Sequence, residues 1–87
     1  KLEQIITGVP YGIHPVSAWV KQDSGNPTIC RMELSDYGGP TVYSKIPHGN
    51  SYVQISGQVY VKNGRVKITF YEEGSNSNLL IDNVKIY

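Results

Sequence analysis

Residues 52–73 read YVQISGQVYVKNGRVKITFYEE, and this stretch decides the expected fold. Apolar and polar residues alternate in it with a period of two, as side chains do on the two faces of a β-strand. Asn63 and Gly64 separate two such runs and form the sharpest hairpin signal in the chain. The stretch therefore predicts a hairpin of two long strands, each with one apolar and one polar face.

The same alternation continues along the chain and predicts about six strand segments, the hairpin counted as one. The other runs are LEQIITGV (2–9), PVSAWVKQ (15–22), TICRMELSD (28–36), TVYSKI (41–46) and LLIDNVKIY (79–87). Seven Tyr, nine Gly and abundant Val, Ile and Thr are typical of β-structure, and no segment keeps a helical period. We therefore expect residues 1–87 to form one all-β domain, a β-sandwich of antiparallel strands.

The net charge and the length of the chain limit which partners it can bind and how its folded state can be stabilised. Eight basic and seven acidic residues give a net charge of +1, and their scatter argues against a nucleic-acid or membrane surface. A domain of 87 residues buries only roughly 60% of its unfolded surface. Its one cysteine, Cys30, cannot form an internal disulfide. A metal ion is the remaining candidate for an internal cross-link. The opening KLEQ, without Met or a signal sequence, suggests a segment excised from a larger protein.

The closing run LLIDNVKIY places a carboxylate, Asp82, among residues expected to pack in a sheet. We expect Asp82 to be buried, which is costly unless its charge is compensated. A metal ion would compensate it. Hydrogen bonds from backbone N–H groups at a strand end are the alternative.

Strand parity also predicts a polar and aromatic outer face. It places Trp19, Arg31, Glu33, Tyr71 and Glu73 away from the core. Aromatic planes stack on the apolar C–H face of a sugar ring, and charged groups hydrogen-bond its hydroxyls, so this combination suits a carbohydrate. The competing interpretation is that Trp19 is packed and the remaining side chains are ordinary solvated sheet surface.

Enzyme chemistry has little support in the sequence. His14 and His48 fall in predicted loops, and neither a nucleophile elbow nor a metalloprotease motif occurs. Cys30 takes a core-facing position, where a thiol is inert. Glu33 and Glu73 are the only carboxylate pair that a hydrolase would use.

Five motifs in order, VSAWVK, MELSDYGGP, SYVQISGQVYV, VKITFYEEG and LLIDNVKIY, resemble the jelly-roll carbohydrate-binding modules, notably families four, nine, sixteen and twenty-two. The resemblance covers most of the chain from about Leu2 onward. It implies a secreted bacterial β-jelly roll without catalytic activity, which targets an attached glycoside hydrolase to its polysaccharide. Such modules usually have further N-terminal strands, so a reduced version, or the C-terminal two-thirds of one, is expected here.

The resemblance also implies a structural calcium ion held in part by the acidic residue of the closing strand, which is Asp82. Asn83 stands where many relatives have a second Asp, and its amide or backbone oxygen can still coordinate calcium.

The expected partners are a polysaccharide or oligosaccharide and the parent enzyme, in a secreted, extracellular or cell-surface setting, with no nucleic acid and no membrane. Trp19, Arg31, Glu33, Tyr71 and Glu73 are the expected ligand contacts. Two other classes stay open: a structural or adhesion spacer in which Trp19 is buried, and a hydrolase.

Overall fold

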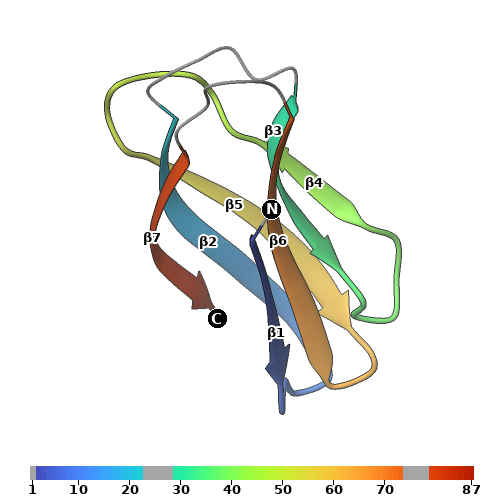
Figure 1. Ribbon diagram of the computed structural model, residues 1–87. Helices are drawn as coiled ribbons and strands as arrows, with labels where there is room; N and C mark the ends of the chain where they lie inside the picture. The colour runs from blue at the N-terminus through green and yellow to red at the C-terminus, as the bar shows by residue number, and fades with distance from the viewer. Residues whose placement is uncertain (1, 23–28, 74–78) are drawn as a thin grey trace.

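The computed structural model describes residues 2–22, 29–73 and 79–87, which form seven strands (Figure 1). In chain order they are β1 (Leu2–Thr7), β2 (Gly12–Gln22), β3 (Ile29–Ser35), β4 (Val42–Lys45), β5 (Val53–Val61), β6 (Arg65–Glu73) and β7 (Leu79–Ile86). The described ranges contain no helix. The all-β prediction is therefore confirmed. The segments 23–28 and 74–78, between predicted strand runs, lie outside the described residues.

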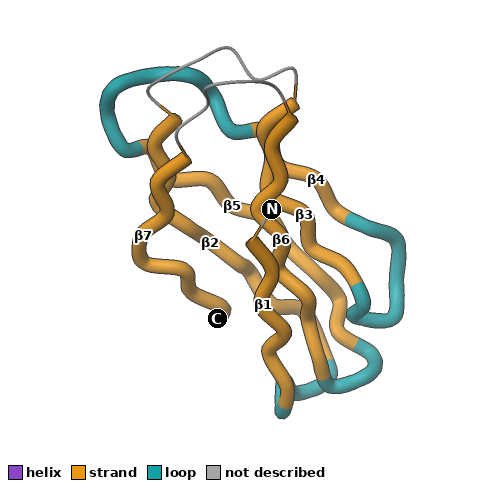
Figure 2. Tube along the Cα trace, viewed as in Figure 1, coloured by secondary structure: helices purple, strands orange, loops and turns teal. Residues whose placement is uncertain are grey.

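The strands form two antiparallel sheets that pack face to face (Figure 2). One sheet has the order β1-β6-β3-β4 and the other the order β5-β2-β7. Only β3 and β4 are consecutive strands paired in one sheet. Every other connection takes the chain from one sheet to the other, as Figure 1 shows. The expected antiparallel β-sandwich is thus confirmed.

The turn at Asn63 and Gly64 is correctly predicted, but the hairpin is not. Gly64 has a φ of 78°, and its carbonyl oxygen accepts a hydrogen bond of 3.0 Å from the backbone N–H of Val9. The flanking strands β5 and β6 belong to opposite sheets. Both strands have an apolar face, and a turn that crosses between the sheets lets these two faces meet in the core.

The core lies between the sheets and follows the predicted parity. A Cβ atom added to Gly57 of β5 would lie 2.9 Å from Leu34 Cδ1 of β3 in the opposite sheet. Glycine therefore allows the two sheets to approach here. The side chains with no exposed surface are Val16, Ala18, Val20, Met32, Leu34, Val61, Val66 and Ile68.

Three single-residue expectations differ from the structure. Thr69 points outward as predicted but is only 3% exposed, because Glu3 and Glu33 flank it in register on the neighbouring strands. Val53, which alternation places on the apolar face of its strand, is 36% exposed at the start of β5. His14 lies within β2 rather than in a loop, whereas His48 does lie in a loop.

The segment Asp36–Tyr37–Gly38–Gly39–Pro40 forms a turn between β3 and β4. Gly38 has a φ of 94° and Asp36 a φ of 56°. Tyr37 is buried beneath the turn, and its hydroxyl donates a hydrogen bond to the carbonyl oxygen of Pro40. Tyr37 is therefore a structural residue.

Candidate functional site

The outer face of the four-stranded sheet carries a cluster of aromatic and charged side chains from three neighbouring strands. The β3–β6 register places Arg31 opposite Tyr71, and the β3–β4 register places Glu33 opposite Tyr43. Their sequence neighbours Cys30, Met32 and Leu34 are buried, so alternation turns this set outward. We call it the Arg31 cluster; its members are Arg31, Glu33, Tyr43, Tyr71 and Glu73.

Arg31 is the centre of this cluster. Its guanidinium carbon lies 4.7 Å from the centre of the Tyr43 ring and 5.4 Å from that of Tyr71, within the range of cation–π attraction. Its Nε–H donates a 2.6 Å hydrogen bond to Glu33 Oε2. This bond raises the pKa of the Arg31 guanidinium further, while burial opposes the shift. The guanidinium is thereby held between two rings on adjacent strands.

Tyr71 and Glu73 form the second polar pair of the cluster. The Tyr71 hydroxyl donates a hydrogen bond to Glu73 Oε1. That bond, followed by burial, raises the pKa of Tyr71. The face thus combines two ring surfaces with two carboxylates, a phenol and a guanidinium, which are groups that bind sugar hydroxyls.

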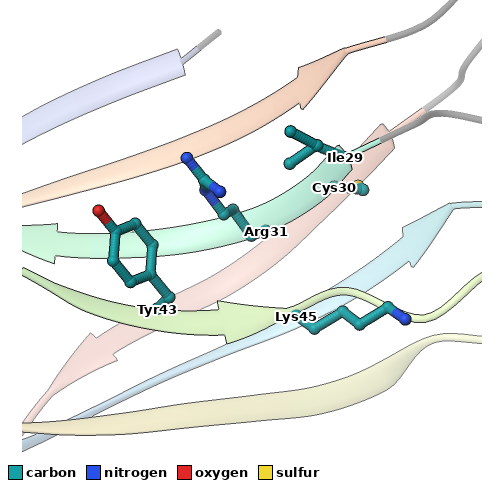
Figure 3. A pocket seen from close by; sticks show the side chains of 5 residues that line it. All are labelled: Ile29, Cys30, Arg31, Tyr43 and Lys45. Carbon is teal, nitrogen blue, oxygen red and sulfur yellow. The ribbon is translucent and has the colours of Figure 1, made fainter.

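A pocket opens at the β4 side of the cluster. It has a volume of about 360 Å³ and is lined by Ile29, Cys30, Arg31, Tyr43 and Lys45 (Figure 3). Tyr43 is 59% exposed and presents its ring to solvent. The sequence indicated Tyr43 only weakly, although Val42 and Ser44 on either side take the inward parity of β4.

Trp19 does not join this cluster, which corrects the prediction of a single binding face. It lies on β2, the central strand of the other sheet, opposite Gln54 of β5 and Asp82 of β7. Its side chain is on the outer face, as parity predicted, and is 37% exposed. A sandwich has two outer faces, so Trp19 and Tyr71 point in opposite directions.

The Trp19 side of the molecule carries its own aromatic residues. Lys21 Nζ lies 5.5 Å from the centre of the Tyr52 ring. At the far end of β5, Tyr60 meets Tyr11 edge to face at 5.4 Å between ring centres. These residues are a second exposed aromatic surface, separate from the Arg31 cluster.

Asp82 is exposed, which corrects the expectation that it is buried. An exposed carboxylate is solvated by water, so it needs no ion to compensate its charge. Calcium takes six to eight oxygen ligands. Within residues 2–22, 29–73 and 79–87, no three His, Cys, Asp or Glu side chains converge on a common point. Among these described residues Asp82 therefore belongs to no cluster of acidic side chains, and calcium binding stays an untested prediction.

The carboxylate pair considered for a hydrolase comes from two neighbouring strands. Glu33 stands opposite Thr69 of β6, whereas Glu73 lies four residues further along the same strand. At about 3.3 Å per residue this separates their backbone positions by about 13 Å. Each carboxylate accepts a hydrogen bond within the cluster, Glu33 from Arg31 and Glu73 from Tyr71.

Comparisons with known proteins agree with this architecture. The sequence matches no protein-family profile. It is 32% identical over 72 residues to a protein named 1,6-alpha-glucosyltransferase from Sporosarcina globispora. That alignment covers 79% of this chain but only 6% of the relative, so the chain spans a small part of that protein.

The fold is also similar to a solved structure, that of TmCBM61 in complex with β-1,4-galactotriose. The TM-score is 0.74 at 22% sequence identity, and the match covers 98% of this chain and 59% of the other. This likeness shows that the two chains share a fold. In the ranges that the structure describes, no helix is long and apolar enough to cross a membrane.

Proposed function

We propose that this domain binds a carbohydrate through the outer face of its four-stranded sheet. The observation that carries the proposal is the Arg31 cluster, in which two tyrosine rings and paired charged groups from three strands lie beside a pocket of about 360 Å³. Exposed rings supply stacking surfaces, and the carboxylates and guanidinium supply directed hydrogen bonds to hydroxyl groups.

The comparisons support a carbohydrate ligand without naming it. The structural neighbour TmCBM61 was solved with β-1,4-galactotriose, and the sequence relative is named a glucosyltransferase. We infer that the domain is a non-catalytic accessory module of a larger carbohydrate-active enzyme, because the match spans 6% of that relative. The more specific assignments, to module families four, nine, sixteen or twenty-two, to a glycoside hydrolase parent and to a secreted or cell-surface location, belong to this same proposal.

A glycan array with neutral and acidic oligosaccharides tests the proposal, together with retention on β-1,4-galactan and on the α-1,6-glucan dextran. We expect saturable binding to at least one glycan and no release of sugar from it. Release of reducing sugar would instead indicate a hydrolase. Failure to bind any glycan by a folded protein would overturn the proposal in favour of a structural spacer.

A further inference from the structure

Among the described residues that line the pocket beside the Arg31 cluster, two carry a positive charge and none carries a negative one. Arg31 on β3 and Lys45 on β4 are direct cross-strand partners. Side chains in such pairs start about 5 Å apart, and like charges placed opposite each other destabilise a sheet. The remaining lining residues, Ile29, Cys30 and Tyr43, are apolar or aromatic. The described lining of the pocket therefore carries cationic groups from two adjacent strands.

The nearby acidic residues compensate the charge of Arg31 but not that of Lys45. Glu33 bonds to Arg31 Nε from the next outward position of β3, and Glu73 accepts the Tyr71 hydroxyl on β6. Neither carboxylate lines the pocket. Among the residues that the structure describes, Lys45 forms no ion pair. Figure 3 shows Lys45 on β4, the strand across the ladder from Arg31.

We propose that this pocket selects an anionic sugar unit, one that carries a carboxylate, as the ligand of the carbohydrate-binding face. This inference rests on the proposed function and specifies its substrate class. The sugar ring lies against Tyr43, and its carboxylate lies between Arg31 and Lys45. Arginine contributes a planar set of N–H donors suited to carboxylate oxygens, and the lysine ammonium contributes a compact point charge.

The test compares each polysaccharide with its own charged derivative. Binding is measured by isothermal titration calorimetry to β-1,4-galactan and dextran, each neutral and carboxymethylated. We expect one carboxymethylated polymer to bind about tenfold more tightly than its neutral form. A hydrogen bond to a charged group stabilises a complex enough to lower Kd by about this factor. The preference should shrink as salt is raised from about 0.05 to 0.5 M because exposed charges are screened.

Two matched lysine variants separate the pocket from general attraction by a positively charged protein. Lys45→Gln should lose most of the preference for the charged polymer and keep its affinity for the neutral one. Lys85→Gln makes the same charge change at an exposed position on the other sheet and should keep the preference. An equal loss in both variants overturns the pocket as the site.

The two levels of the proposal fail in different ways. Equal affinity for neutral and charged polymers overturns the anionic selectivity but leaves carbohydrate binding in place. If no polymer and no arrayed glycan binds, carbohydrate binding and the anionic selectivity are both overturned.

Discussion

Replacing Tyr43 by alanine should weaken carbohydrate binding about tenfold while the domain stays folded. A tyrosine side chain offers about 200 Å² of surface, and 59% of Tyr43 is exposed. One face of the ring is about half of that exposed area, or about 60 Å². At about 25 cal/mol per Å² its coverage by a sugar contributes about 1.5 kcal/mol, a factor of about ten in Kd.

The fold should tolerate this change because Tyr43 is mostly solvent-exposed and its main described contact is the Arg31 guanidinium. The assay is calorimetric titration with the best ligand from the array, with circular dichroism to verify folding. Tyr43→Phe keeps the ring and should bind within about twofold of the original protein. Trp19→Ala alters the opposite sheet and should also bind within about twofold of the original protein. Unchanged binding by folded Tyr43→Ala, or a tenfold loss in Trp19→Ala, would refute the assignment of the binding face.

Three further predictions concern stability and reactivity. The pKa of the Cys30 thiol is raised, mainly by burial and then by the charge of Glu72. Iodoacetamide at about pH 8 should therefore label the native protein far more slowly than the unfolded one. Equal labelling rates would contradict this. Gly57→Ala should cost about 1–3 kcal/mol through its contact with Leu34, seen as a Tm lowered by roughly 4 °C or more. Because Asp82 is exposed, a chelator should leave Tm unchanged; a drop abolished by Asp82→Ala would instead establish the calcium site.

Local alternation predicted the strands well because it reflects which side chains face the core. Cys30, Met32 and Leu34 are buried, and Arg31 and Glu33 between them face outward. Short-range parity alone is enough to predict which side chains of a strand are buried and which face outward. Parity also turns the four predicted ligand contacts of β3 and β6 outward, and the pairing of these two strands brings them together.

The assignment of strands to sheets was not predictable from local pattern. Asn63 and Gly64 have the residue types of a hairpin turn, yet their flanking strands belong to different sheets. Parity assigns Trp19 and Tyr71 equally to an outer position, although a sandwich has two outer faces. Which face each residue occupies depends on the pairing of β2 with β5 and β7 and of β6 with β1 and β3, and these contacts are distant in sequence.

The adjacent polar residues Asp82 and Asn83 inside the closing strand are explained by backbone geometry. The β2–β7 register shifts between Ser17, opposite Lys85, and Trp19, opposite Asp82, so β7 contains one extra residue there. Asn83 has a φ of 55°, a conformation that asparagine tolerates better than most residues. The bulge lets Ile81 and Val84, three residues apart, both pack against the core while Asp82 faces solvent. The spacing that first suggested a buried carboxylate is therefore the spacing of a β-bulge.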